Sequence, residues 1–470
     1  MLIFEKIKKQ IMNLLIRNGL VVNADKSAWA DVLVCDGRIE QLAPGIDPQA
    51  FDAEVIDASG KLVIPGGVDP HVHFQLPTAA GHSSDDFLSG STAALMGGVT
   101  TFIDFVTPQR GQSLPQALEQ RLAEAKASRI DYSLHVSPVE MHDGLETEML
   151  QCMQQGIRSF KVYMAYLETI GLKQESLKKV LNILGRYGCL ATVHAETGEL
   201  IAGLRDEYFN KGQVAPFFHA LSRPPHTESE AVQQLLELAA AAGCPVYLVH
   251  ISAAASLEHI RAAREAGQTV YAETCPQYLL LNDMAYDQDF EQAARFVISP
   301  PLRKKHDNDA LWQALSSRLI QSTGTDHCPF TMQQKRLGRD DFRKIPNGAG
   351  GVEHRMALLY TYGVLENRLS LGRWVDLTAT GPARIFGLYP RKGCICPGAD
   401  ADLVIWDPAQ ETVIAADLHH QQTDINIFEG IKTKGAPEYV ISGGRIAAAQ
   451  GRLMADGLKG RFLRQEKPGQ

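Results

Sequence analysis

Between Gly67 and Tyr389 the sequence alternates between short apolar runs and longer segments with helical spacing. The apolar runs are VDPHVHF, VTTFIDFV, IDYSLHV, SFKVYMAY, CLATVHAE, PVYLVHIS, TVYAETCP and LIQSTGTDH. The segments between them include LPQALEQRLAEAKAS and ESEAVQQLLELAAAAG, which have the spacing of amphipathic helices. Eight strand–helix alternations in about 320 residues are typical of a (β/α)8 TIM barrel. A chain of 470 residues has room for this barrel and a smaller domain.

The two chain ends have a β-strand pattern instead. LLIRNGLVV contains Asn-Gly and DVLVCDGRI contains Asp-Gly, which are hairpin-turn dipeptides between apolar runs. ADLVIWDP and YVISGGRIA, near the other end, also predict strands, with a Gly-Gly turn in the second. We therefore expect an α/β fold, with a barrel over residues 67–389 and a small β-sandwich domain formed by residues 12–66 and 390–455. Residues 1–11 are predicted to be an N-terminal extension, with Met12 as the natural start, and residues 456–470 a polar C-terminal tail.

Charge and cysteine content exclude several classes of protein. The net charge is −8 and no long run of one sign occurs, so we expect neither a nucleic-acid nor a membrane partner. No apolar stretch is long enough to span a bilayer. The eight cysteines lack the paired spacing of a structural zinc site, which favours free thiols in a reducing, cytoplasmic location.

Four histidines fall at the ends of the predicted barrel strands, where the active sites of such barrels lie. His71 and His73 are two apart in the first run and so share one face of a strand. His194 and His250 close the fifth and sixth runs. Any one of them is equally well explained as a core or surface histidine. Together, at matching strand ends, they predict a metal site, because imidazole is a common metal ligand.

Two further residues extend this predicted site. Asp326 closes the eighth run, where a carboxylate can bind a metal or carry a proton; a helix N-cap is the structural alternative. Lys161 lies inside an apolar strand, where a cation is costly unless it is paired or neutralised. Reaction of Lys161 with CO2 would give a carbamate whose two oxygens can each bind one ion. The alternative is an ammonium paired with a carboxylate such as Asp326.

With these residues the sequence resembles the dihydropyrimidinase and D-hydantoinase group, the cyclic amidases of the amidohydrolase superfamily. The resemblance extends from about Asn13 to Lys467. It is carried by the motifs PGGVDPHVHF, SDDFLSGSTAALMGGVTTFIDF, SFKVYMAY, TVHAE, YLVHIS, SPPLR, TGTDHCPF, KIPNGAGGVEHRM, ARIFGLYPRKG and ADLVIWDP.

The resemblance implies two divalent metal ions, zinc or alternatively manganese, bridged by a hydroxide. It assigns one ion to His71, His73, Asp326 and N6-carboxylated Lys161, and the other to Lys161, His194 and His250. It makes Asp326 the catalytic proton shuttle and Tyr166 a catalytic, substrate-binding residue that donates a hydrogen bond to the oxyanion. Ser299 and Asn347 match positions whose main chains bind the edge of the substrate ring.

The implied function is hydrolysis of the cyclic amide bond of dihydropyrimidines and 5-substituted hydantoins, which gives N-carbamoyl amino acids. The implied assembly is a homotetramer. A dihydroorotase would carry an arginine shortly after H-x-H, where this chain has Phe74. Allantoinase shares the metal scheme and stays open as an alternative. A non-catalytic dihydropyrimidinase-related scaffold would have lost ligands that this chain retains.

Overall fold

The eight apolar runs form one parallel sheet in the computed structural model, which describes residues 13–454 and 457–467. The strands are hydrogen-bonded in the order β15-β14-β13-β12-β11-β10-β9-β6. Their bounds are β6 Gly67–Val72, β9 Val99–Val106, β10 Asp131–Val136, β11 Ser159–Tyr163, β12 Leu190–His194, β13 Val246–Leu248, β14 Val270–Thr274 and β15 Ser322–Thr323. Almost every residue in these strands is buried, as expected where helices cover the outer face of a parallel sheet. The predicted barrel is confirmed.

The first and last strands meet at a seam that is closed by a few contacts just beyond β15. Val72 and His327 form an isolated parallel bridge, and the amide of His73 donates to the carbonyl of His327 at 2.8 Å. Below this bridge, the hydroxyl of Thr325 donates to the carboxylate of Asp69 at 2.7 Å. The seam therefore lies next to two of the predicted ligands, His73 and Asp326.

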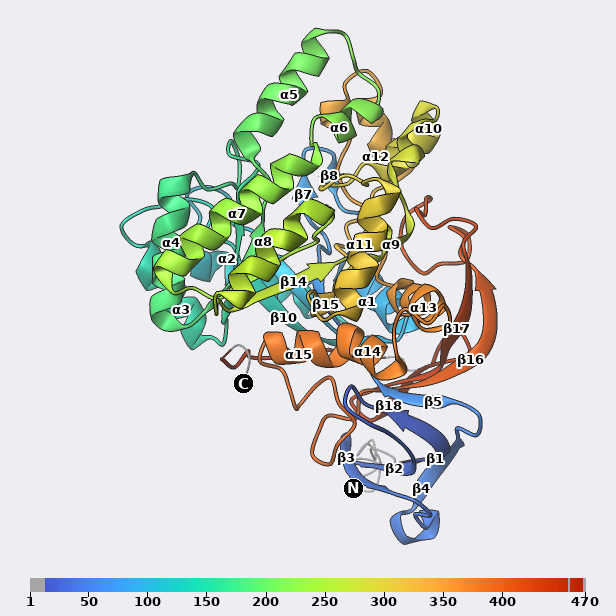
Figure 1. Ribbon diagram of the computed structural model, residues 1–470. Helices are drawn as coiled ribbons and strands as arrows, with labels where there is room; N and C mark the ends of the chain where they lie inside the picture. The colour runs from blue at the N-terminus through green and yellow to red at the C-terminus, as the bar shows by residue number, and fades with distance from the viewer. Residues whose placement is uncertain (1–12, 455–456, 468–470) are drawn as a thin grey trace, which may run out of the picture.

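Helices wrap the outside of the barrel (Figure 1). Those that follow the strands are α1 Phe87–Met96, α2 Leu114–Ala125, α3 Leu145–Gln154, α4 Gln174–Tyr187, α7 Pro225–Ala242, α8 Ala254–Glu265 and α11 Lys305–Ser316. Further helices in the connections include α5 Gly198–Asn210, α6 Phe217–Leu221, α9 Pro276–Leu280, α10 Phe290–Ala293, α12 Met332–Lys335, α13 Arg355–Leu359, α14 Leu371–Val375 and α15 Gly381–Ile385. In α4 the buried side chains recur at helical spacing, and the helix ends at Gly188, which has the left-handed φ of 61° that glycine tolerates. The helical segments predicted from the sequence correspond to α2 and α7.

The second sheet is built from both chain ends, beside the barrel in Figure 1. Its nine strands are β1 Asn13–Val22, β2 Ser27–Cys35, β3 Arg38–Ala43, β4 Ala53–Asp57, β5 Leu62–Pro65, β16 Leu403–Val413, β17 Lys432–Ser442, β18 Arg445–Ala449 and β19 Arg452–Leu453. Antiparallel pairing of β5 with β16 joins the two ends of the chain. The fold class is confirmed, while the domain boundaries drawn from the sequence stay predictions.

The hairpin turns predicted from the sequence have two different outcomes. Asp36-Gly37 and Gly443-Gly444 connect β2 to β3 and β17 to β18, with positive φ at all four residues. The turn predicted at Asn18-Gly19 is wrong, because β1 continues through it with a bulge. Asn18 takes the left-handed conformation, with φ of 63°, and a Cβ on Gly19 would lie 2.5 Å from Val63. The dipeptide therefore bends a strand that is flanked by neighbours on both sides.

Beyond the second sheet, residues 457–467 run back along the barrel. The amide of Tyr132 donates to the carbonyl of Arg461 at 3.0 Å, and the amide of Leu463 donates to the carbonyl of Tyr132 at 2.7 Å. The predicted extension at residues 1–11, the proposed start at Met12 and residues 456 and 468–470 of the predicted tail lie outside the described residues. Within the described ranges, no helix is both long and apolar enough to cross a membrane.

Candidate metal centre

All six predicted metal ligands lie at the carboxyl end of the barrel strands. His71 lies in β6, His73 just after it, Lys161 in β11, His194 at the end of β12, His250 two residues after β13 and Asp326 three residues after β15. Parallel pairing of β11 with β12 sets Lys161 beside Thr192, and Tyr163 beside His194. The barrel register therefore brings candidate ligands from five strands to the same end of the barrel.

His71, His73 and Asp326 converge on a single atom. The Nε2 atoms of both histidines lie 3.2 Å from Oδ1 of Asp326. Burial opposes the charge on Asp326, but the histidines around it hold the pKa of this carboxyl well below its usual range. Asp326 also has φ of 53°, an uncommon conformation for a residue other than glycine. The arrangement supplies one anionic oxygen and two imidazole nitrogens to one point.

Glu273, in β14, orients His71 from behind. Its carboxylate accepts a hydrogen bond from Nδ1 of His71, the Tyr247 hydroxyl at 2.7 Å and the His250 amide at 3.1 Å. Burial alone would lower the pKa of His71, but the carboxylates of Glu273 and Asp326 raise it to about 9. A carboxylate that fixes the tautomer of a metal-binding histidine is a recurrent arrangement. Sequence reasoning did not select Glu273, whose only local signal is an acidic residue inside an apolar strand.

His194 and His250 form the second half of the cluster. Nδ1 of His194 lies 2.9 Å from Nε2 of His250, while Nε2 of His194 donates to Glu196 at 2.8 Å. Arg223 in turn forms a buried ion pair with Glu196. Although burial opposes its charge, Arg223 and His194 lower the pKa of Glu196 to about 2. Because Glu196 accepts from Nε2, the Nδ1 lone pair of His194 faces the same space as Nε2 of His250.

Lys161 is buried in this cluster with its ammonium over two aromatic rings. Nζ lies 4.8 Å from the ring centre of Phe105 and 5.0 Å from that of Tyr163. Within the described ranges no carboxylate lies within 4.0 Å of Nζ, so the alternative of an ion pair with Asp326 is not what the structure contains. Burial lowers the pKa of Lys161 to about 8, which makes its neutral amine accessible to an electrophile such as CO2.

The residues present fit divalent metal ions. Suitable donor atoms of His71, His250 and Asp326 all lie within 4.8 Å of one another. Nε2 of His71 is buried and forms no hydrogen bond within the described part of the chain, although it points into this cluster. Imidazole and carboxylate donors suit zinc and similar ions, and a cation would relieve the unpaired nitrogen.

The three predicted substrate-binding residues lie at the same end of the barrel. The ring of Tyr166 is 5.4 Å from that of His194, centre to centre, and its backbone has a φ of 58°. The side-chain amide of Asn347 donates to the Ser299 hydroxyl at 3.0 Å, so these two residues lie side by side. Asp326 and His73 are the partly exposed members of the ligand set, with 17% and 11% of their side-chain surface accessible. Solvent therefore reaches the cluster on their side.

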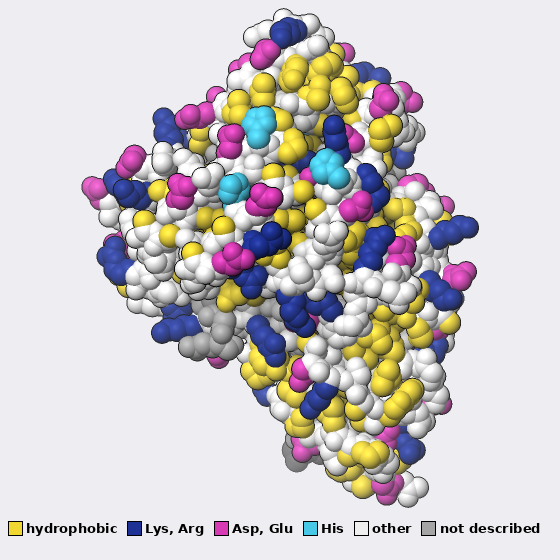
Figure 2. All heavy atoms as spheres, in the orientation of Figure 1, with side chains coloured by type: hydrophobic (Ala, Val, Ile, Leu, Met, Phe, Trp, Pro, Cys, Tyr) yellow, Lys and Arg dark blue, Asp and Glu magenta, His cyan; other side chains and the backbone are white. Residues whose placement is uncertain are grey.

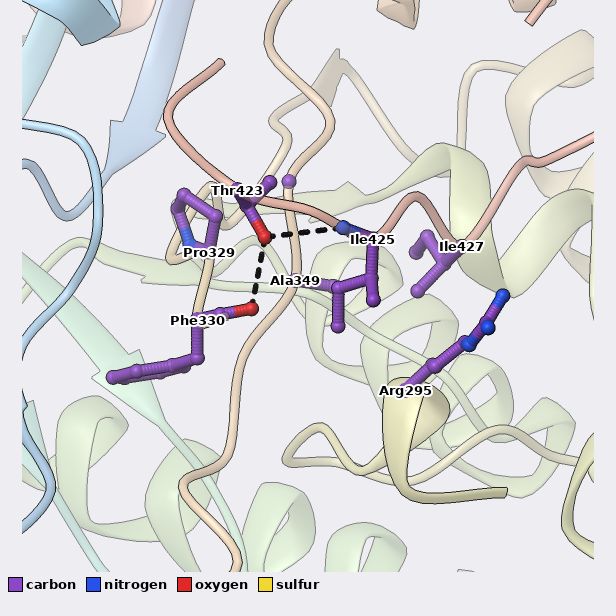
Figure 3. A pocket seen from close by; sticks show the side chains of 8 residues that line it. Arg295, Pro329, Phe330, Ala349, Thr423, Ile425 and Ile427 are labelled. Carbon is purple, nitrogen blue, oxygen red and sulfur yellow. Dashed lines mark hydrogen bonds between the residues drawn. The ribbon is translucent and has the colours of Figure 1, made fainter. Parts of the chain in front are cut away.

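A small cavity is lined in part by Pro329 and Phe330, in the segment that follows Asp326 (Figure 3). Its volume is about 10 Å³, space for a single water molecule. In this cavity the Thr423 hydroxyl donates to the carbonyl of Phe330 at 2.9 Å and accepts from the amide of Ile425 at 3.4 Å. These bonds attach the long connection between β16 and β17 to the loop after β15, and the cavity itself is too small for a substrate.

Comparison with known proteins identifies the family. The family model described as "Amidohydrolase family" matches residues 62–447. A D-hydantoinase of Geobacillus stearothermophilus is 40% identical over 462 residues, which cover 97% of this chain and 98% of the relative. A D-phenylhydantoinase of Escherichia coli O1:K1 / APEC is 41% identical over 459 residues, which cover 97% of this chain and 98% of the relative.

A solved structure agrees with the sequence comparisons. The crystal structure of dihydropyrimidinase from Brevibacillus agri NCHU1002 superposes with a TM-score of 0.96 and 39% identity, covering 98% of this chain and 100% of that one. At this level of similarity, along nearly the full length of both chains, the barrel and the second sheet are shared together. The chain is therefore an enzyme of the amidohydrolase family, in the group of its D-hydantoinases and dihydropyrimidinases.

Proposed function

We propose that the protein hydrolyses the cyclic amide bond of 5-substituted hydantoins and dihydropyrimidines, and that it yields N-carbamoyl amino acids with two divalent metal ions in its site. Four imidazoles and one carboxylate converge at the mouth of the barrel beside the buried Lys161, and this convergence carries the proposal. The names of the relatives, D-hydantoinase, D-phenylhydantoinase and dihydropyrimidinase, support the substrate class.

The ligands divide into two groups that share Lys161. His71, His73 and Asp326 would hold one ion, and His194 and His250 the other. Addition of the neutral Lys161 amine to CO2 forms an N–C bond and releases one proton, which leaves a carbamate with one oxygen for each group. The product is a buried anion beside two metal sites, in place of a neutral amine. We propose zinc as the metal, with manganese as the alternative.

The ions would make hydroxide available near neutral pH and polarise the amide carbonyl. Asp326, whose depressed pKa keeps it ionised, would accept the proton of the attacking hydroxide and pass it to the departing ring nitrogen. Tyr166 donates a hydrogen bond from its hydroxyl to the oxygen that gains charge during attack. The main chains of Ser299 and Asn347 offer one donor and one acceptor each to the –CO–NH–CO–NH– edge of the ring.

A panel of rings tests this proposal against its rivals. The metal-loaded enzyme should hydrolyse dihydrouracil and 5-substituted hydantoins at least about 100-fold more efficiently than dihydroorotate, the discrimination that a carboxylate without a partner would impose. Preferential hydrolysis of allantoin would move the protein to the allantoinases. Pure protein that binds zinc or manganese but opens none of these rings would contradict the proposed activity. Protein that binds neither metal and has no activity would favour the scaffold alternative.

We also propose a homotetramer in the cytoplasm. Phe217 and Leu221 on α6 are 41% and 39% exposed, and apolar side chains gather at this end of the molecule in Figure 2. Such exposure is typical of surfaces that pack against another subunit. All eight cysteines are free thiols, which suits a reducing compartment. Light scattering coupled to gel filtration measures the assembly, and a monomer at micromolar concentration would contradict it.

A further inference from the structure

Lys335, the last residue of α12, is a second buried lysine, and it lies outside the metal cluster. Its ammonium donates to three main-chain carbonyls, those of Val297 at 2.9 Å, Pro346 at 2.8 Å and Gly348 at 2.8 Å. Three is the full donor capacity of an ammonium group. Among the described residues no carboxylate lies within salt-bridge distance of it. The side chain therefore acts entirely on the backbone of two loops.

The three carbonyls flank the two residues that would bind the edge of the substrate ring. Val297 is two residues before Ser299, and Pro346 and Gly348 lie on either side of Asn347. The two loops also contact each other directly. The amide of Gly348 donates to the carbonyl of Val297 at 3.0 Å, and the side chain of Asn347 donates to the Ser299 hydroxyl at 3.0 Å. Lys335 lies where a single group can set the separation between the loops.

We propose that Lys335 is a positioning residue for substrate, which holds the main chains of Ser299 and Asn347 at the spacing that the –CO–NH–CO–NH– edge requires. This role rests on the proposed function, because it assumes that these two main chains bind the ring. Lys335 touches neither the substrate nor the metal ligands. It acts through the carbonyls of Val297, Pro346 and Gly348.

Electrostatics explain why a cation is needed at this place. Three carbonyl oxygens that converge on one point repel each other, and in a buried site water does not screen that repulsion. If Lys335 is removed, the carbonyls of Pro346 and Gly348 lose the hydrogen bond from its ammonium, while the carbonyl of Val297 keeps the one from the Gly348 amide. Burial lowers the pKa of Lys335 to about 7, so the protein holds this ammonium at a cost in free energy. Perturbed groups of this kind concentrate at functional sites.

Hydrogen exchange followed by mass spectrometry tests the contact between the loops. Lys335→Met removes the ammonium with little change in side-chain length, and Lys344→Met makes the same substitution at an exposed lysine nearby. In the metal-loaded protein, Lys335→Met should speed exchange in the peptide that covers residues 345–351. Peptides of β12 and the bound metal content should be unchanged, and Lys344→Met should match wild type. Unchanged exchange in the 345–351 peptide would overturn the inference.

Kinetics with two rings test the role in substrate binding. Hydantoin presents –CO–NH–CO–NH–, whereas succinimide has the same imide but a CH2 in place of the second N–H. In wild type the ratio of kcat/KM for hydantoin over succinimide reports how well the loops bind this edge. Lys335→Met should raise KM for hydantoin about tenfold, the size of one lost hydrogen bond to a well-placed partner, with a smaller change in kcat. The ratio should fall about fivefold or more by the same reasoning, and Lys344→Met should leave it unchanged.

The outcomes separate this inference from the proposed function. Wild type that opens hydantoin, together with a Lys335→Met variant whose hydantoin-to-succinimide ratio equals that of wild type, overturns the role of Lys335 alone. Wild type that opens neither ring overturns the proposed function and the substrate role of Lys335 with it. If Lys335→Met is insoluble, Lys335→Gln keeps two N–H donors. It should show the same pattern at smaller size, and an unchanged ratio in that variant would also overturn the inference.

Discussion

Three residues of the candidate site have a backbone conformation that residues other than glycine rarely adopt. Tyr166, His250 and Asp326 have φ values of 58°, 39° and 53°. Each lies where the chain leaves a buried barrel strand, after β11, β13 and β15 respectively. A left-handed residue there turns the chain sharply, and such strain concentrates at functional sites because the surrounding structure must hold it. Here it is held by the barrel strands that precede each turn.

Lys161→Ala should abolish the shared ligand. Without the carbamate, the carboxylate of Asp326 is the only anionic ligand left for the two groups of imidazoles. We therefore expect fewer metal ions per subunit and an activity that is lower by about 10³-fold or more, the range of metal-dependent activation. Metal analysis with a hydantoin assay measures both quantities, and Lys178→Ala on the exposed face of α4 is the control. Added formate or acetate should restore part of the activity. Wild-type metal content and turnover in Lys161→Ala would contradict the carbamate.

Asp326→Asn separates proton transfer from metal binding. The amide keeps one oxygen toward His71 and His73 but has no charge to accept a proton. We therefore expect retained metal and a kcat lower by about 10²-fold or more, the usual contribution of a general acid–base group. Steady-state kinetics on metal-loaded protein decide the matter. Turnover at the wild-type rate would show that the proton takes another route.

Glu273→Gln should weaken metal binding indirectly, through the hydrogen bond that Glu273 accepts from His71. The glutamine keeps the shape but not the negative charge that orients His71. We expect a metal affinity lower by about 10–100-fold, as is usual for such carboxylates. Competition with a chelator gives the affinity, and Glu119→Gln on the exposed face of α2 provides the matched control. Equal affinities for Glu273→Gln and wild type would limit Glu273 to packing.

At this scale the sequence indicates the candidate ligands more readily than the residues that support them. The histidines, Lys161 and Asp326 occur at strand ends, and that regularity can be read locally. Glu273 is 202 residues from the histidine it orients, and Arg223 is 27 residues from Glu196. A local pattern does not reveal such partners, because the barrel register alone makes them neighbours.

Among the elements, the turn after β11 is the one that aims a predicted catalytic side chain. The carbonyl of Tyr166 accepts from the amides of Thr169, Ile170 and Gly171 at 3.0, 3.1 and 2.9 Å. A Cβ on Gly171 would lie 2.1 Å from the carbonyl of Ala165, so the turn closes only with glycine there. Its outer side is held by Arg110, which comes from the loop after β9.

Arg110→Ala should loosen this turn without touching the metal ligands. Arg110 donates to the carbonyl of Thr169 at 2.8 Å and to that of Leu167 at 3.0 Å. The loss of two hydrogen bonds, each about 1 kcal/mol, should lower kcat about tenfold if the turn then samples other positions of Tyr166. Metal content should stay at the wild-type value, and Arg261→Ala on exposed α8 is the control. An unchanged kcat would mean that the hydrogen bonds within the turn are enough to hold Tyr166 in place without Arg110.

The elements also show where local signals mislead. Asn-Gly, Asp-Gly and Gly-Gly carry the same turn preference, yet Asn18-Gly19 became a bulge inside β1. The reason is that β1 pairs with β2 on one side and with β4 and β5 on the other. Hydrogen bonds to three neighbours outweigh the preference of two residues, and two of those neighbours, β4 and β5, begin only at Ala53 and Leu62.

In the whole molecule, a buried charge cluster joins the barrel to the second sheet. The ammonium of Lys392 lies 2.7 Å from Asp131 in β10 and 3.1 Å from Asp400, and it also pairs with Asp402. Arg461, from the chain's last described segment, pairs with Asp131 at 2.6 Å and Asp400 at 2.8 Å. Although burial opposes its charge, the carboxylates raise the pKa of Lys392. The lysine thus occupies the centre of three carboxylates that would otherwise repel.

Lys392→Met should destabilise the protein strongly. Removal of one partner from a buried ion cluster leaves uncompensated charge, at a cost of about 3–5 kcal/mol. Urea unfolding at pH 7 measures the loss, with Lys432→Met on the exposed side of β17 as the control. The ratio of kcat to KM in the native protein should change little, because the cluster is remote from the strand ends that carry the ligands. Equal unfolding midpoints for both variants would contradict the role of the cluster.

The seam of the barrel determines when the candidate metal site can form during synthesis of the chain. His73 and Asp326 stand on opposite sides of that seam, more than half the chain apart in sequence. During synthesis the first two imidazoles exist long before the carboxylate that completes their set. A partial chain that stops before the eighth strand lacks Asp326, so it has no complete set of candidate ligands even if its earlier strands pair correctly. The candidate site can therefore be complete only once the eighth strand has closed the barrel.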